Sequence, residues 1–212
     1  MPAQGPEVRH PLFARLCAVM TRKEPAVVRE HRRELLRGLS GRVLELGAGA
    51  GANFAFYPAE VSEVVAVEPE PYLHGKATEA AASASVRVTV VHGTADRLPA
   101  EDASCDTVIA CLVLCSVPDQ SAALAELHRV LRPGGELRFY EHVLSHKPHV
   151  ARSQRVVDRL FWPRAFGGCH TARDTPAAIA DAGFAIERQR RLSVGPRFVP
   201  AATHVLGAAR RT

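Results

Sequence analysis

A glycine-rich loop with an acid just ahead of it is the stretch of this sequence whose residue types point most directly to chemistry. In "VLELGAGAGA", which begins at residue 43, Glu45 precedes Gly47, Gly49 and Gly51. Glycines let the backbone approach a ligand closely and adopt positive φ angles. A pyrophosphate binds the amides of a helix N-terminus best without a carboxylate nearby. Glu45 therefore favours a ligand whose nearest part carries a positive charge.

Two further acids follow apolar runs at which strands are expected to end. Glu68 ends "EVVAVE" and can accept hydrogen bonds from both hydroxyls of a ribose, in bonds that its charge strengthens. Asp96, in "GTADRLP", can accept from an adenine amino group while the Ala95 amide donates to a ring nitrogen. Pro69 can pack on the adenine, and Asp96 can instead cap a short helix. Together these residues indicate an adenosine.

S-adenosylmethionine joins an adenosine to an amino acid that carries an ammonium and a sulfonium, which matches Glu45 at the loop and Glu68 at the ribose. The loop also satisfies G-x-G-x-x-[GA], the dinucleotide pattern. Nicotinamide enzymes use a strand-end acid in the same way. A nicotinamide or flavin site, and a tight turn without a ligand, therefore remain alternatives at this point.

These residues must be positioned by a sheet, because short apolar runs alternate with helical patterns. Ligands of such α/β proteins bind at the carboxyl ends of the strands. The expected strands are 42–46, 63–68, 86–91, 105–114 and 136–143, and the helix-compatible pieces between them are 52–57, 70–83 and 119–131.

The C-terminal part has a different pattern. "DTPAAIADAGF" predicts a helix capped by Asp174 or Thr175. The runs 184–192 and 202–210 follow, and a short Gly-Pro loop between them predicts an antiparallel pair at one edge of the sheet.

Length predicts one domain over residues 1–212, with a helical N-terminal cap over 1–40 and an insertion over 143–173 on the acceptor side. No apolar run is long enough to span a membrane, and no basic segment precedes an apolar one as in a signal peptide. The five cysteines form no paired framework. We expect a cytoplasmic protein, as a monomer or homodimer. The net charge is +5, but no basic run is interleaved with aromatic residues, so we expect no nucleic-acid partner.

Five segments occur in an order that resembles a known family. They are "VLELGAGAG", "AVEPEP", "GTADRLP", "CDTVIACLVLCSVPD" and "LHRVLRPGGELRFYEH". Together they resemble the class I S-adenosylmethionine-dependent methyltransferases of the ubiquinone/menaquinone-biosynthesis type. The chain is also similar to the alkyl-thiol methyltransferases of animals, through "GANF-x-FYP", a "TLVLCSV"-like segment, "EHV" and a later "GC-x-x-T-R". Those enzymes begin with an apolar anchor that this sequence lacks, so we expect no integral membrane association.

The resemblance implies a Rossmann-like α/β fold with seven strands in the order 3-2-1-4-5-7-6, strand 7 antiparallel, and helices on both faces. It also implies the parts of the cofactor that individual residues meet. Glu45, Gly47 and Gly49 meet the methionine end, and Asn53 helps to hold its carboxylate; Gly51 belongs to the same cofactor-binding loop. Glu68 binds the ribose, and Pro69, Ala95 and Asp96 meet the adenine. Cys111 and Leu112 lie beside the methionine amino group.

The methyl acceptor requires a base if it is a thiol, hydroxyl or enol. His142 ends a predicted strand and is the first candidate; His170, beside Cys169, is the second. Histidine is the residue type best suited to act as a base at neutral pH, and both side chains can instead be structural. The spacing of His142, His146, His149 and Cys169 matches no common zinc pattern, so we expect no metal site.

Other residues near the predicted acceptor side have two interpretations. Cys111 and Cys115 flank "LVL", and we expect them in the core, although arsenic methylation uses exposed cysteines. "VVDRLFWP" predicts an amphipathic helix around Trp162. Its apolar face can line an acceptor pocket, pack within a lid or lie against a membrane.

We therefore expect an enzyme that transfers a methyl group from S-adenosylmethionine to a small molecule, leaving S-adenosylhomocysteine. The acceptor is a thiol, or a hydroxyl or carbon of an aromatic or quinone-like metabolite. The alternatives are a pericyclase-like protein that binds the cofactor without methylating, and a lipid methyltransferase at a membrane surface.

Overall fold

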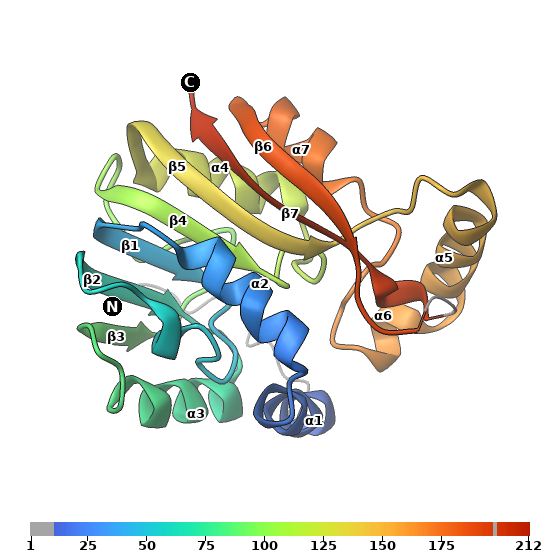
Figure 1. Cartoon of the computed structure of the whole chain (residues 1–212), viewed down its shortest axis with the longest axis horizontal. Coiled ribbons are helices and arrows are strands. Elements are labelled where there is room, and N and C mark those ends of the chain that lie inside the picture. The colour runs from blue at the N-terminus through green and yellow to red at the C-terminus, as the bar shows by residue number, and fades with distance from the viewer. Residues whose placement is uncertain (1–10, 197–198) are drawn as a thin grey trace.

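A computed structural model describes residues 11–196 and 199–212, so the first ten residues of the predicted N-terminal cap lie outside it (Figure 1). Seven strands form one sheet in the order β3-β2-β1-β4-β5-β7-β6. Strand β7 is antiparallel to both of its neighbours, and β1 to β5 are parallel. The predicted order and the antiparallel seventh strand are confirmed. The strands are β1 Gly41–Leu46, β2 Val61–Val67, β3 Val88–Val91, β4 Cys105–Cys111, β5 Leu131–His142, β6 Phe184–Ser193 and β7 Thr203–Arg211.

Helices cover both faces of the sheet. Figure 1 shows α2 crossing in front of the strands, with α4 and α7 behind them, while α5 and α6 lie beyond one end of the sheet. The helices are α1 Pro11–Arg22, α2 Ala26–Leu36, α3 Pro71–Ala81, α4 Gln120–Val130, α5 Pro148–Leu160, α6 Trp162–Ala165 and α7 Thr175–Asp181, with 3-10 turns at Phe54–Phe56 and Pro200–Ala202. Among the described residues, no helix combines the length and the apolar character that crossing a membrane requires.

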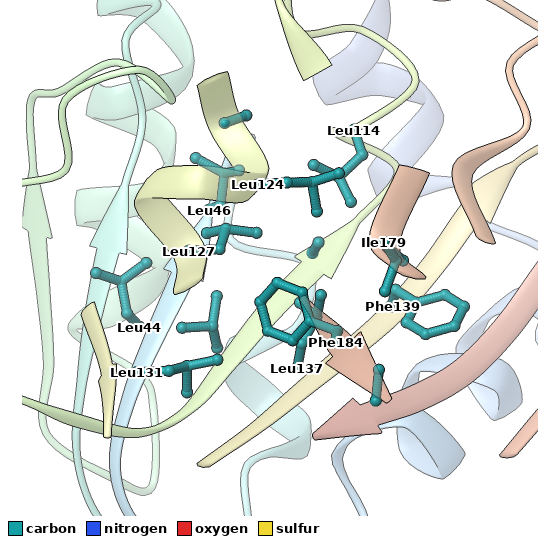
Figure 2. Packing of buried hydrophobic residues seen from close by; sticks show 14 of the residues in the cluster. Leu44, Leu46, Leu114, Leu124, Leu127, Leu131, Leu137, Phe139, Ile179 and Phe184 are labelled. Carbon is teal, nitrogen blue, oxygen red and sulfur yellow. The ribbon is translucent and has the colours of Figure 1, made fainter. Parts of the chain in front are cut away.

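The core on the α4 and α7 side joins the two helices to the sheet (Figure 2). Leu46 of β1, Leu124 and Leu127 of α4, Ile179 of α7 and Phe184 of β6 are all buried in this cluster. Burying a side chain of this size stabilises the fold by roughly 1.5–3 kcal/mol. The parallel strands are apolar on both faces because helices cover both faces. This packing fixes the strand ends that carry the predicted site.

Two helices begin at aspartates whose side chains satisfy free backbone N–H groups. The carboxylate of Asp119 accepts from the N–H groups of Ser121 and Ala122 at the start of α4. At α7, Asp174 accepts from Ala177 N, which resolves the choice between Asp174 and Thr175. Such caps are each worth about 1 kcal/mol.

The structure corrects two predicted elements. The strand expected over 105–114 ends at Cys111, because Leu112 adopts a φ of 58° and its N–H donates to Tyr140 O at 2.7 Å. The next three residues leave the sheet because the buried carboxylate of Glu141 accepts from their backbone N–H groups at 2.9–3.1 Å. The helical piece expected over 52–57 is only the short 3-10 turn.

Candidate active site

A cavity of about 600 Å³ opens where the carboxyl ends of β1, β2, β4 and β5 meet α1 and α2. This is the edge at which open α/β sheets bind ligands, and the volume suits a cofactor-sized molecule. The sequence-predicted residues that line it are Glu45, Gly47, Gly49, Glu68, Pro69, Ala95, Asp96, Cys111, Leu112 and His142.

Three predicted site residues are not among the described residues that line the cavity: Gly51, Asn53 and His170. Gly51 has a φ of +78°, and a Cβ there would lie 2.8 Å from Phe54 and from Ala80, so this glycine serves packing. Asn53 is buried behind the cavity wall. His170 is treated with the insertion below.

Glu45 is held rigidly under the glycine loop. Asn53 Nδ2 donates to its Oε1 at 2.8 Å, and the Tyr57 hydroxyl donates to its Oε2 at 2.6 Å. Burial raises the pKa of Glu45 to about 7, while the hydrogen bonds from Tyr57 and Asn53 and the positive charge of Arg32 oppose that rise. Asn53 therefore acts through Glu45, and a cation bound on the cavity side would restore the full charge of this acid.

Arg32 of α2 is a site residue that sequence reasoning missed. Its guanidinium donates to Asn53 Oδ1 at 2.9 Å and to Cys111 Sγ at 3.0 Å, and it pairs with Glu24 at 2.8 Å. It also lines the cavity. Arg32 lies on the same helical face as the buried Val28, four residues earlier. This spacing could have indicated from the sequence that Arg32 points toward the protein interior.

Glu68 joins the end of β2 to the glycine loop. Its Oε2 accepts from Gly49 N at 2.7 Å, and its Oε1 accepts from Glu70 N at 2.9 Å. Burial raises the pKa of Glu68, and the two backbone hydrogen bonds oppose that rise. Asp96 lies exposed in a turn closed by a bridge between Thr94 and Arg97, so it does not cap a helix.

At the opposite side of the cavity, His142 meets two buried cysteines. Its Nδ1 lies 3.4 Å from Cys115 Sγ and 3.5 Å from Cys169 Sγ. The hydrogen bond between the two thiols lowers the pKa of Cys169 and raises that of Cys115; burial also raises both, and His142 helps to lower that of Cys169. Cys169 is therefore the thiol of the pair that ionises more readily, and Cys115 the one that keeps its proton. Cys115 follows β4, and His142 is the last residue of the adjacent parallel strand β5. This placement indicates that the two side chains lie close together, but sequence reasoning did not use it.

Two aromatic residues that line the cavity beside His142 were also missed. The ring of Tyr140 stacks on His204, with centroids 5.1 Å apart, and His204 lies 4.5 Å from the ring of His142. Burial, together with the neighbouring His142, lowers the pKa of His204 to about 3. His204 is therefore neutral at physiological pH.

The insertion over 143–173 is tied down by buried polar side chains. Gln154 Nε2 donates to three backbone carbonyls at 2.9–3.1 Å, and the carboxylate of Asp158 accepts from Thr171 and Ala172. The ring Nδ1 of His170 lies 3.6 Å from Asp158 Oδ2. This contact turns His170 toward the insertion, away from a role at the cavity.

The aromatic residues of "VVDRLFWP" do not line the cavity, which was one of the three roles predicted for that helix. Leu160 is 65% exposed and Phe161 49% exposed, and neither lines the cavity. Trp162 stacks on Phe166 at 4.1 Å within the insertion. The apolar wall comes instead from α1 and the segment after it, through Phe13, Ala14, Cys17, Met20 and Pro25.

Residues 44–139 match a family model described as "Methyltransferase domain". Over 93% of its length the chain is 35% identical to Thiol S-methyltransferase TMT1B of Homo sapiens, and the match covers 85% of that protein. It is 31% identical to the ubiquinone/menaquinone biosynthesis C-methyltransferase UbiE of Syntrophotalea carbinolica, over 64% of this chain and 58% of that protein.

Solved structures share the fold at low sequence identity. A putative methyltransferase from Bacillus halodurans matches with a TM-score of 0.73 and 15% identity, over 88% of this chain and 99% of that one. N-methyltransferase NodS from Bradyrhizobium japonicum, in complex with S-adenosyl-L-homocysteine, matches with a TM-score of 0.68 and 17% identity, over 89% of both chains.

Proposed function

Because the chain belongs to the class I S-adenosylmethionine-dependent methyltransferases, we propose that this enzyme methylates the sulfur of a small thiol. Methyl transfer from S-adenosylmethionine to a small-molecule acceptor is the activity of the family, and the sulfur acceptor is the finer assignment. The observation that carries it is similarity to a thiol S-methyltransferase along nearly the whole chain. The apolar wall of the cavity supports it.

The residues around the glycine loop fit the methionine end of the cofactor. Gly49 has a φ of +58° and lines the cavity, and no atom lies within 4 Å of where its Cβ would be, so the backbone is open to a ligand. At Gly47 a Cβ would lie 2.3 Å from Val113, so only glycine allows the loops to approach each other. Glu45, below them, is the acid that faces the ammonium. We assign Leu112 and Cys111 to the same end of the cofactor.

The adenosine half would lie between β2 and the turn after β3. Glu68 keeps acceptor capacity for the ribose hydroxyls, because a carboxylate can accept about four hydrogen bonds and the structure shows two. Pro69 borders the same part of the cavity, and Ala95 and Asp96 lie where an adenine edge can be recognised.

Removing the Glu68 carboxylate should weaken cofactor binding without abolishing the fold. We expect Glu68→Ala to reduce the affinity for S-adenosylmethionine by about 1.5–3 kcal/mol, the range for hydrogen bonds to a charged group. Isothermal titration calorimetry measures this directly. Glu79→Ala, which removes an exposed acid of α3, is the matched control and should bind with wild-type affinity. An unchanged affinity in Glu68→Ala would exclude Glu68 from the ribose site.

The reaction needs an acceptor held in line with a methyl group and freed of its proton. When bound, S-adenosylmethionine would supply a methyl group attached to a sulfonium, which makes the methyl carbon open to attack by a nucleophile. The apolar wall of α1 excludes water from the reacting atoms. We assign His142 to the acceptor because it lines the cavity and ends a strand, which fixes its place. With its Nδ1 toward the cysteines, Nε2 is the nitrogen that remains to accept a proton.

A panel of acceptors tests the choice of sulfur. We expect small alkyl and aryl thiols to be methylated with kcat/KM values at least about tenfold above those of matched phenols, alcohols and quinols. The rate at which S-adenosylhomocysteine forms measures the turnover of every acceptor, so the values can be compared directly. Higher kcat/KM values for the oxygen compounds would refute a thiol methyltransferase and favour a natural-product enzyme.

A further inference from the structure

Three donor atoms from three separate segments converge beside the cavity, where His142 lines its wall. Cys115 follows β4, His142 ends β5, and Cys169 follows α6. Their donor atoms all lie within 4.8 Å of one another. The two cysteine side chains are buried, and His142 is partly exposed toward the cavity.

The distances among these atoms are those of a tetrahedral zinc site. Zinc binds sulfur at about 2.3 Å and imidazole nitrogen at about 2.0–2.1 Å. With tetrahedral angles, these lengths separate two sulfurs by about 3.8 Å and a sulfur from a nitrogen by about 3.6 Å. The structure has 3.9 Å between Cys115 Sγ and Cys169 Sγ, and 3.4 and 3.5 Å from these sulfurs to His142 Nδ1.

We propose that Cys115, His142 and Cys169 bind one Zn²⁺, whose fourth coordination position takes the sulfur of the methyl acceptor. Three protein ligands with an open fourth position are the pattern of catalytic zinc, and a Cys₂His set is one of its forms. This set differs from the histidine-rich one considered in the sequence, because Cys115 is distant in the chain and reaches the site through the sheet.

The backbone around the three donors is built to hold them together. Glu141 accepts the N–H of Cys115 at 3.1 Å, and Cys115 O accepts from His170 N at 2.7 Å. Gly168 has a φ of +84°, and a Cβ there would lie 2.9 Å from Ser116 O, so glycine is what allows the two cysteine segments to meet. Contacts of this kind orient the ligands of metal sites.

His142 is the member of the cluster that lines the cavity, while Cys115 and Cys169 lie buried behind it. His142 lines the cavity, and so do Ser116, next to Cys115, and Gly167, two residues before Cys169. A fourth ligand can therefore reach the metal from the cavity.

This inference rests on the proposed thiol acceptor and assigns the chemistry that activates it. A thiol that coordinates Zn²⁺ loses its proton to solvent, because the metal favours the thiolate. The bound thiolate then forms a new S–C bond with the methyl carbon while the bond from that carbon to the cofactor sulfonium breaks. The electron pair of the broken bond goes to the cofactor sulfur. In this arrangement His142 is a ligand through Nδ1, and the metal replaces the imidazole as the group that ionises the thiol.

Metal analysis of the purified protein tests the site. We expect about one zinc per chain by inductively coupled plasma mass spectrometry, in the wild type and in the control Cys105→Ser, whose buried thiol lies at the opposite end of β4. Substituting residues that only orient metal ligands lowers metal affinity by about 10- to 100-fold. Cys115→Ser and Cys169→Ser remove a ligand and should lower zinc affinity by more than this. Circular dichroism confirms that each variant is folded.

Cobalt substitution tests the open position independently of turnover. The Co²⁺ protein should show thiolate-to-cobalt charge-transfer absorption that Cys169→Ser weakens, and 2-mercaptoethanol should shift its visible bands while phenol does not. A folded wild type that binds neither metal at this site would overturn the inference and leave thiol methylation standing. Visible bands unchanged by the thiol would overturn the open position. A loaded protein whose bands respond to the thiol but that methylates none would support the metal site and refute the proposed function.

Discussion

Replacing Glu45 by glutamine should weaken S-adenosylmethionine binding by about 2–5 kcal/mol, the cost of removing one partner of a buried, hydrogen-bonded charge pair. The same substitution should make the unliganded protein more stable above neutral pH. Glutamine has the shape of glutamate and keeps the acceptor for Asn53 Nδ2. The two effects have opposite signs because the acid is buried to meet a cation that arrives with the cofactor.

The pH dependence of this gain has a definite sign. Burial raises the pKa of Glu45 from 4.5 to about 7 in the folded protein, so the folded state binds more protons than the unfolded state between those values. Stability therefore falls as pH rises through this window. At about 1.4 kcal/mol for each pKa unit, the loss reaches about 3 kcal/mol above pH 7.

Urea unfolding at pH 4.5 and pH 8 measures the difference. Wild type and Glu45→Gln should have similar free energies of unfolding at the lower pH, and the variant should be more stable by up to about 3 kcal/mol at the higher one. Glu60→Gln, which changes an exposed acid, is the control. Equal stability at pH 8 would mean that the charge of Glu45 is already compensated without the cofactor, and unchanged calorimetric affinity would remove it from the cofactor site.

Replacing His142 by alanine should lower the turnover of a thiol acceptor by about 10²–10⁴-fold, the usual contribution of a general base. The same substitution removes one ligand of the proposed zinc site. The affinity for S-adenosylmethionine should stay close to wild type, because His142 ends β5 and the glycine loop follows β1, and β4 lies between these two strands. His170→Ala should retain wild-type turnover, since its ring pairs with Asp158 in the insertion. His149→Ala changes an exposed histidine of α5 and is the matched control.

Single-turnover kinetics at saturating thiol separates the chemical step from binding. A wild-type rate in His142→Ala would contradict its assignment to the acceptor. A loss in His170→Ala equal to that in His142→Ala would instead indicate that the insertion, and not the end of β5, carries the reacting histidine.

The sequence predicts those residues of the site that lie at the ends of strands. Parallel strands bring their carboxyl ends to one edge, so Glu45, Glu68 and the turn at Asp96 had to meet once the strands were identified. The same reasoning places His142 there. The strand order follows from resemblance to a family, since local patterns alone do not say which strands are neighbours.

The remaining residues of the site depend on side-chain directions and on contacts between distant segments. The side chain of Arg32 points inward from α2, which carries two other arginines, and only packing shows which of the three is buried. Cys169 reaches Cys115 because a glycine permits close approach of two loops. Asn53 was assigned to the ligand but bonds to Glu45, because a polar residue beside a site can equally serve the residues that bind.

The amphipathic pattern of α5 predicted an apolar face but not what covers it. Gln154 is buried and bonds to three carbonyls, while Leu160 is exposed. Periodicity finds a face that differs from the rest of the helix. It does not say whether the polar or the apolar side meets the protein, and here one long polar side chain fixes the helix to the fold.

The measurement that tests the thiol assignment most directly offers sulfur and oxygen in one molecule. The enzyme is incubated with 4-mercaptophenol and S-adenosylmethionine labelled in its methyl group, and mass spectrometry with nuclear magnetic resonance locates the label. We predict 4-(methylthio)phenol, with an equal amount of S-adenosylhomocysteine. Glu45→Gln should form much less product at cofactor concentrations below its raised Kd. Label on the phenol oxygen, or cofactor bound without any labelled product, would contradict a thiol methyltransferase.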